Sequence, residues 1–196
     1  MFDYKMKMDP QVNTMCKSAW FHLYTIGKIR SYLSDDQTKS VVHAYVTPRL
    51  DGNNALLVGP RRDYLIDKPQ LVQNADAKII SKSKKFNHVT PLLCQLHWLL
   101  ISKRITFKVL LFVCKSLNNL GPIYLRHLLT YYKPKCEGLR HDPLSLEVPG
   151  TKLVTYGDRA CRVVAAKAWN QLPNNIRAAK TVDRFKADLK TYLFKL

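Results

Sequence analysis

Apolar residues recur every three or four positions along most of this chain, which is the spacing of one buried face of an α-helix. The first run extends from Val12 to Leu33 and the last from Val182 to Leu193. Between them lie similar runs at residues 41–46, 65–79, 102–118, 123–131 and 161–172. The pattern predicts a mainly α protein, in which a helical bundle is followed by a second helical region.

Residues suited to capping mark several of the predicted helix starts. Ser34 precedes Gln37 by three positions, which is the spacing of a capping box. Asp158 and Thr181 stand at the predicted starts of the two closing helices and can cap them. A Thr-Pro pair at 90–91 opens another helix, because proline is tolerated at the first helical position.

Two stretches interrupt the helical pattern. The polar residues 81–85, with the sequence SKSKK, favour a boundary, so we expect two regions at 1–85 and 86–196. Prolines and glycines break up residues 133–156 into short alternating segments. That composition predicts an irregular insert or a small hairpin within the second region.

The charge of the chain indicates what it binds. Lysine and arginine number 32 against 14 acidic residues, which gives a net charge of +18. Residues 1–98 hold 14 basic and 8 acidic residues, and residues 99–196 hold 18 and 6, so the excess is not confined to a tail. Such a balance favours a polyanion, either nucleic acid or an anionic membrane surface. We favour nucleic acid, because the apolar helix faces are expected to pack against one another rather than against lipid.

The chain carries no signal for a membrane span or for secretion. Its longest strongly apolar run, 109–114, is bounded by lysines and is far shorter than the roughly 20 residues that a span needs. The first residues include no apolar stretch that could act as a secretory signal. The five cysteines show neither C-x-x-C nor zinc-finger spacing. We expect reduced cysteines in an intracellular protein, nuclear or cytoplasmic, with its oligomeric state left open.

No group of residues has the spacing of an active site. The only adjacent carboxylates, Asp35 and Asp36, follow the predicted cap Ser34. There a solvated first turn is a simpler interpretation than a two-metal site. The histidines are isolated, and the chain has no glycine-rich phosphate loop. We therefore predict no catalytic residue, metal ligand or cofactor in this chain.

Basic residues that lie off the apolar faces or at helix starts are the candidates for nucleic-acid contacts. They are Lys17, Lys28, Arg30, Lys103, Arg104, Lys108, Arg159, Arg162 and Arg177. Each phosphate that they neutralise would add salt-sensitive affinity. The alternative for any one of them is a solvated outer face of a helix. Aromatic residues on the apolar faces are expected in the core rather than in base stacking: Trp20, Phe112, Trp169 and Phe185.

Several segments resemble the C-terminal end of reverse transcriptases from jockey-like non-LTR (LINE) retrotransposons. The most specific are HVTPLL at 88–93, LHWL at 96–99, YGDRA at 156–160 and AAKAWNQLP at 165–173. Others are similar in order and spacing, at residues 16–19, 29–33, 42–51, 107–108, 117–125, 176–177 and 185–194. The resemblance covers nearly the whole chain.

The resemblance implies that this chain binds nucleic acid but does not itself catalyse DNA synthesis. In that family the metal-binding aspartates belong to an aromatic-Ala-Asp-Asp motif upstream of the matching region, and this sequence has no such motif. The chain is expected to begin after the last strands of the palm and to hold a thumb-like helical bundle and the region beyond it. By resemblance, the thumb binds an RNA or DNA primer–template duplex through its backbone. Magnesium is expected only for the palm.

Departures from the family pattern leave a second interpretation open. Pro69 replaces an apolar helical residue, where it removes a helical hydrogen bond, and Asp76 stands where alanine is usual. Gly52, Leu100 and Cys161 also differ from the residues usual at their positions. Changes on buried faces each cost about 1–4 kcal/mol. The alternative is therefore a decayed, transposon-derived helical protein with no activity, or a protein-interaction fragment.

Overall fold

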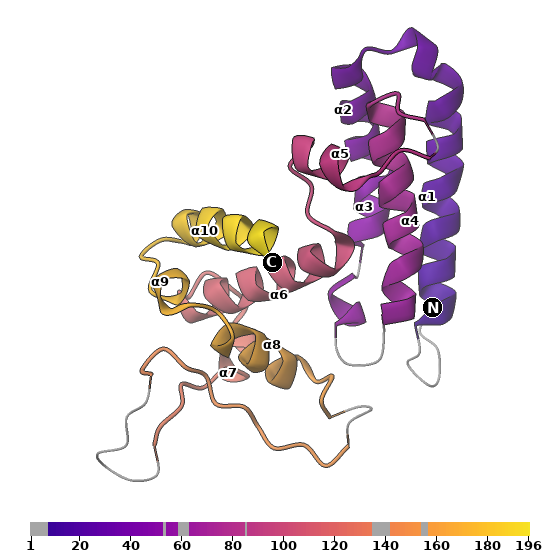
Figure 1. Ribbon diagram of the computed structural model, residues 1–196. Helices are drawn as coiled ribbons and strands as arrows, with labels where there is room; N and C mark the ends of the chain where they lie inside the picture. The colour runs from indigo at the N-terminus through magenta and orange to yellow at the C-terminus, as the bar shows by residue number, and fades with distance from the viewer. Residues whose placement is uncertain (1–7, 53, 59–62, 85, 135–141, 154–156) are drawn as a thin grey trace. The chain divides into compact units, whose positions relative to one another are not determined.

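The computed structural model describes residues 8–52, 54–58, 63–84, 86–134, 142–153 and 157–196, and it confirms the mainly α class. Figure 1 follows the helices in chain order. The chain divides into two compact units, each described by itself below. Unit 1 comprises residues 1–57 and 61–102, and unit 2 comprises residues 58–60 and 103–196.

Unit 1 is a bundle of helices around an apolar core. In chain order its elements are α1 (Asp9–Ile29), the 3-10 helix η1 (Arg30–Tyr32), α2 (Asp35–Tyr45), α3 (Thr47–Asp51), the 3-10 helix η2 (Asn54–Leu57), α4 (Asp63–Ile80) and α5 (Thr90–Gln95). The buried face of α1 carries Val12, Met15, Cys16, Ala19, Leu23 and Ile26. These residues follow the three- and four-residue spacing of the sequence, which confirms most of the predicted core face. Ile29, also on the apolar run, is 43% exposed and lies outside the core.

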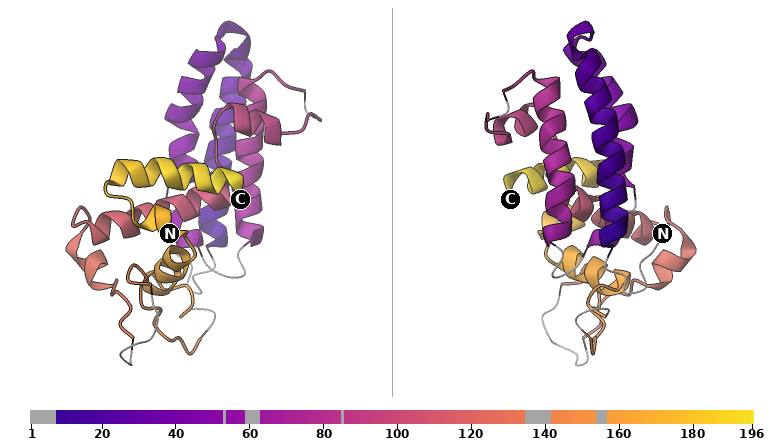
Figure 2. Two further views of the ribbon diagram at one scale, coloured as in Figure 1. Left: turned by 60° about the vertical axis from the view of Figure 1, so that its left-hand side comes forward. Right: turned by 90° about the vertical axis from the view of Figure 1, so that its right-hand side faces the viewer.

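Helices α1 and α4 run in the same direction beside each other (Figure 2). Near their starts, Lys68 Nζ donates to Asn13 Oδ1 at 2.7 Å. Near their ends, Arg30 Nε donates to the carbonyl oxygen of Ile79 at 2.8 Å. The pairing holds the two helices in register over nearly their whole length.

Helix α4 passes through Pro69 without a break. Proline in a helix interior costs about 3 kcal/mol, because it donates no hydrogen bond to the carbonyl four residues earlier. Packing outweighs that cost, since Leu65 and Val72 are fully buried on either side and each such side chain stabilises the fold by about 1.5–3 kcal/mol. Asp76, which stands where the family usually has alanine, is also fully buried.

The segment after the predicted boundary belongs to unit 1. Gln73 Nε2 donates to the carbonyl oxygen of Leu99 at 2.8 Å, and the backbone N–H of Ile101 donates to Gln70 Oε1 at 2.9 Å. Two glutamines of α4 therefore hold residues 99–101 against that helix. This explains why the compact units divide between Ser102 and Lys103, whereas the polar run suggested residue 85.

Two of the predicted caps form as expected. Ser34 and Gln37 make a capping box with both reciprocal hydrogen bonds, and the Thr181 hydroxyl accepts from the N–H of Arg184 at 3.2 Å. The prediction for Asp158 is wrong, because the helix begins at Cys161 and its N-cap is Ala160. Asp158 instead accepts hydrogen bonds from Thr151 and Lys167.

Unit 2 holds the remaining helices. They are α6 (Ile101–Leu117), whose first two residues belong to unit 1, α7 (Ile123–His127), α8 (Cys161–Asn170), α9 (Asn174–Arg177) and α10 (Val182–Lys195). Trp169 and Phe185 are buried and stack with ring centroids 5.6 Å apart, so these two aromatic residues lie in the core as predicted. Leu189 and Leu193 of α10 extend the same core.

The proline-rich insert is tied to α8 by side-chain hydrogen bonds. Trp169 Nε1 donates to the carbonyl oxygen of Leu144 at 2.8 Å. Asn170 Oδ1 accepts from the N–H of Leu146, and its Nδ2 donates to the carbonyl oxygen of the same residue, both at 2.8 Å. Among the residues that the structure describes, the hairpin reduces to one antiparallel bridge between Tyr131 and Leu146.

Candidate nucleic-acid interface

The nine predicted contact residues are distributed over both units. Unit 1 carries Lys17, Lys28 and Arg30, and unit 2 carries Lys103, Arg104, Lys108, Arg159, Arg162 and Arg177. Their surroundings differ: some of these side chains are exposed, some are half-buried, and Arg30 is buried within hydrogen bonds. The geometry of each set decides which of them can meet a polyanion.

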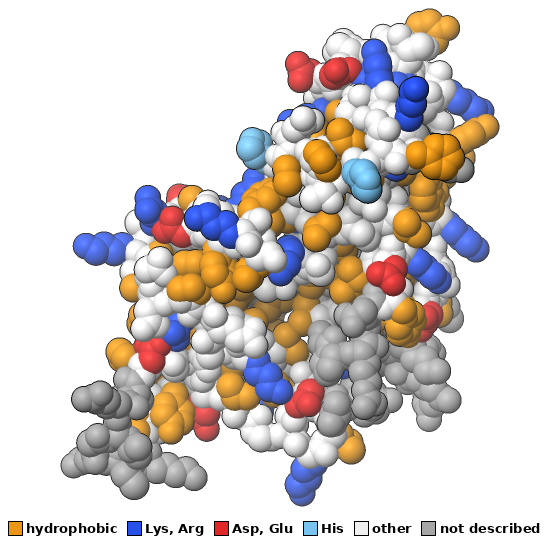
Figure 3. Space-filling model, in the orientation of Figure 1, with side chains coloured by type: hydrophobic (Ala, Val, Ile, Leu, Met, Phe, Trp, Pro, Cys, Tyr) orange, Lys and Arg blue, Asp and Glu red, His pale blue; other side chains and the backbone are white. Residues whose placement is uncertain are grey.

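Helix α1 presents a mixed basic and aromatic surface on the side away from its core. Each residue of an α-helix advances about 100°, so Lys17, Phe21, Tyr24 and Lys28 fall within roughly 60° of one another, opposite the buried face. All four are exposed, and Phe21 and Tyr24 expose 67% and 66% of their surface. We call these four residues the α1 outer face. Figure 3 shows hydrophobic and basic side chains interleaved over this part of unit 1.

The electrostatics of the α1 outer face suit an anion. Lys28 Nζ lies 4.5 Å from the centre of the Tyr24 ring, a cation–π contact that places the ammonium beside the aromatic plane. The acidic residue of α1, Asp9, lies in its first turn, away from the two lysines. Lys17 and Lys28 are eleven residues apart, which corresponds to about 16 Å along the helix. Lysines at this separation can neutralise phosphates while the rings between them contact bases or sugars.

Beside this face lies an open pocket of about 370 Å³ between α1 and α4, which we call the α1–α4 groove. Its lining consists of Trp20, Leu23, Tyr24, Gly27 and Lys28 from α1 and Ala75 and Ile79 from α4. Trp20 is 45% exposed at the groove, so the prediction that it lies in the core is wrong. It lies at the edge of the apolar face, where the spacing alone does not separate core from rim. Phe112, 44% exposed, is a second such case.

Phe21 and Tyr24 are not among the predicted contact residues. The signal was available: residues 17, 21, 24 and 28 follow the helical spacing on the face opposite the apolar run. Exposed aromatic residues do not belong to the apolar pattern that predicts the helix, so that pattern alone does not select them.

Arg30 serves the fold and is not available as the predicted contact. It is 8% exposed, and its guanidinium donates to the carbonyl oxygens of Ile79, Ile80 and Leu33 at 2.7–2.8 Å. It also forms an ion pair with Asp35. The hydrogen bond from Arg30 is the main reason why the pKa of Asp35 lies below its usual value. One helical turn after Ile26, Arg30 falls on the core side of α1 rather than off it.

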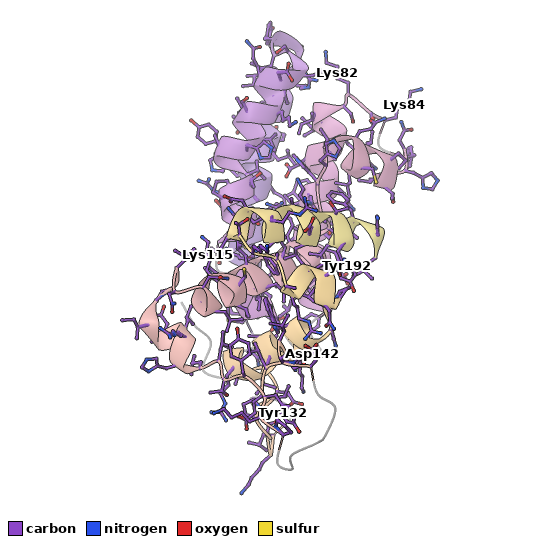
Figure 4. All side chains as sticks on the ribbon, turned by 90° about the vertical axis from the view of Figure 1, so that its left-hand side faces the viewer. Lys82, Lys84, Lys115, Tyr132, Asp142 and Tyr192 are labelled. Atoms are coloured by element: carbon purple, nitrogen blue, oxygen red, sulfur yellow. The ribbon has the colours of Figure 1, made fainter. Side chains whose placement is uncertain are left out.

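Arg177 is likewise held inside unit 2. Its side chain is 6% exposed and forms an ion pair with Asp142 of the insert. Asp142 is labelled in Figure 4. Its guanidinium also donates to Ser145 Oγ at 3.4 Å and to Asn174 Oδ1. These contacts fasten the insert to α9, so the predicted phosphate contact does not fit the position of Arg177.

The other basic candidates of unit 2 differ in exposure. Lys103, Arg104 and Lys108 lie half-buried in the first half of α6, and Arg159 lies half-buried just before α8. Arg162 is exposed in the first turn of α8. On α6, one exposed ring, Phe112, follows half-buried Lys108 by four residues. On α1, two exposed rings lie between two exposed lysines, so the α1 outer face is the better-defined site.

The described residues offer little for covalent or metal chemistry. Burial raises the pKa of the Cys16 and Cys114 thiols, which disfavours the nucleophilic thiolate. Asp35 and Asp36 occupy the first turn of α2 behind the capping box. Within the described ranges, no three His, Cys, Asp or Glu side chains are grouped as a metal site would require. No helix in the same ranges has both the length and the apolar character to cross a membrane.

No family model, curated protein or solved structure matches this chain. The resemblance to LINE reverse transcriptases therefore stays a prediction from the sequence, and the α1 outer face is interpreted from its own chemistry.

Proposed function

We propose that this chain binds nucleic acid through the α1 outer face, as a thumb-like C-terminal region of a non-LTR retrotransposon reverse transcriptase. The observation that carries the binding role is the exposed Lys17–Phe21–Tyr24–Lys28 surface on a protein of net charge +18. The ordered sequence segments supply the reverse transcriptase assignment, which is a proposal from resemblance alone.

The proposed contacts are with the nucleic-acid backbone. Lysine ammonium groups act as compact positive charges for phosphates, and the aromatic rings between them can pack against the sugars. Neither kind of contact reads sequence. A surface of this composition suits a part that holds a primer–template of any sequence. We propose no catalysis by this chain, because its sequence lacks the aromatic-Ala-Asp-Asp motif of the family.

The test measures binding of a labelled duplex and a labelled single strand, each of about 20 nucleotides, between about 50 and 200 mM salt. Fluorescence anisotropy with the full chain gives the slope of log K against log salt. Replacing Lys17 and Lys28 together by glutamine is expected to make this slope shallower by about 1.4–1.8, because each phosphate contact contributes about 0.7–0.9.

The matched control replaces Lys82 and Lys84 by glutamine. Both are exposed, follow α4 in the same unit and point outward (Figure 4), and their loss changes the net charge equally. If both double variants shift the slope alike, general charge and not the α1 outer face accounts for binding. Binding that is absent or indifferent to salt contradicts the proposed function and favours an inert, transposon-derived protein.

A further inference from the structure

The α1–α4 groove is an open apolar hollow between two neighbouring helices. It lies on the flank of the α1 outer face, and its volume of about 370 Å³ falls within the usual range for small-molecule sites, about 300–1,000 Å³. Its wall is apolar except at the rim, where Lys28 stands. Figure 2 shows α1 and α4, which form the two sides, lying against each other.

Gly27 keeps this groove open. Glycine destabilises a helix interior relative to alanine, so a glycine in the middle of a helix calls for a local reason. A Cβ built on Gly27 would meet Ile79 Cδ1 at 4.0 Å, an ordinary contact, and nothing nearer. Neither a close approach nor backbone geometry excludes a side chain here. The absence of a side chain instead leaves space between Tyr24 and Ile79.

The rim of the groove selects the kind of ligand. Trp20 and Tyr24 are four residues apart, and both offer partly exposed rings. The indole N–H of Trp20 and the ammonium of Lys28 can only donate hydrogen bonds. A matching ligand therefore has a flat face for the rings and carries acceptors or negative charge beside it. An unpaired nucleobase with its flanking phosphate has both properties.

We propose that the α1–α4 groove binds an unpaired base of single-stranded nucleic acid, with Lys28 on the neighbouring phosphate. The inference rests on the proposed nucleic-acid function and assigns its single-stranded component to this groove. In a duplex the bases are stacked on one another, so a duplex engages the α1 outer face through its backbone and leaves the groove empty. Base–aromatic stacking does not depend on base identity, so the groove binds without sequence preference.

The proposal is tested by filling the α1–α4 groove with a side chain at position 27. Gly27→Leu places a branched side chain in the space, whereas Gly27→Ala adds only the Cβ that the structure accommodates. Affinities for a labelled mixed-sequence single strand and for the matching duplex are measured by anisotropy on the full chain. We expect Gly27→Leu to weaken single-strand binding about tenfold, the loss of one base-stacking contact, with duplex affinity unchanged. Gly27→Ala is expected to keep both affinities.

A second pair of variants protects the test against misfolding. Trp20→Ala is expected to weaken single-strand binding similarly, and Trp20→Phe to restore it, while far-UV circular dichroism verifies the helical content of each variant. If Gly27→Leu and Trp20→Ala leave single-strand affinity unchanged while the duplex binds with salt dependence, this inference is overturned and the proposed function stands. If neither nucleic acid binds, both fall. If an acidic amphipathic peptide binds the wild type and not Gly27→Leu, and the single strand does not bind, the groove is a peptide site.

Discussion

Two cations near the end of α1 show how position decides the role of a residue. Lys28 points outward beside Tyr24, and Arg30, two residues later, is enclosed by backbone carbonyl groups of Leu33, Ile79 and Ile80. Both contribute equally to the net charge. The exposed one is available to phosphate, and the buried one joins α1 to the end of α4.

Replacing each of these cations by methionine separates the two roles. Arg30→Met leaves buried carbonyl oxygens without their donor, at about 1–3 kcal/mol for each unsatisfied group. We expect the free energy of unfolding, measured by urea titration of the circular dichroism signal, to fall by roughly 2–4 kcal/mol. Lys28→Met removes the same charge from an exposed site and is expected to change stability by less than about 0.5 kcal/mol.

Nucleic-acid binding is expected to separate Lys28→Met and Arg30→Met in the opposite way from stability. Under conditions where both variants are folded, Lys28→Met is expected to weaken nucleic-acid binding and Arg30→Met to leave it unchanged. A stable Arg30→Met variant that binds poorly would show that Arg30 meets the ligand after all.

At the scale of elements, features set by neighbouring residues were predictable from the sequence. Features set by contacts between distant segments were not. The caps at Ser34 and Thr181 are set by hydrogen bonds across three residues, so the local sequence contains them. The continuity of α4 through Pro69 depends on burial against the rest of unit 1, which local spacing does not record. The exposure of Trp20 escaped prediction for the same reason, because it depends on where α4 lies.

The segment AAKAWNQLP at 165–173, one of the segments that carry the family resemblance, has a clear structural role. Its tryptophan and asparagine bind the backbone at Leu144 and Leu146, and Leu172 enters the core. The motif therefore joins an irregular insert to a helix, and nothing in its sequence alone revealed the partner segment. Its residues serve the fold rather than a ligand.

Asn170→Ala tests that role. The substitution removes both hydrogen bonds to the buried Leu146, so we expect the free energy of unfolding to fall by about 2–4 kcal/mol. The amide of Leu146 is also expected to lose protection in hydrogen exchange measured by NMR. Gln171→Ala, at the exposed neighbouring position, is the control and should change neither quantity. Unchanged protection in Asn170→Ala would show that the insert is held by other contacts.

For the whole molecule, the net charge of +18 favours a polyanion but does not say where it binds. Two of the nine predicted contacts, Arg30 and Arg177, are used inside the fold, and each is held by segments distant in sequence. The sequence cannot separate such cations from exposed ones, because the difference lies in long-range packing. The sequence does indicate the α1 outer face, because its four residues lie on one helix and their shared face follows from helical spacing alone.

The alternative of a decayed protein makes a different prediction about the molecule as a whole. Each unit has a buried core with specific side-chain hydrogen bonds, and Pro69 and Asp76, two of the departures from the family pattern, lie within continuous helix. A packed unit of roughly 100 residues unfolds cooperatively, with an enthalpy of about 60–80 kcal/mol near 60 °C. We expect scanning calorimetry of the full chain to show one or two such transitions. A helical spectrum that melts gradually, without a heat-absorption peak, would indicate loose packing, and the α1 outer face would then lack the rigid support that places its lysines and rings together.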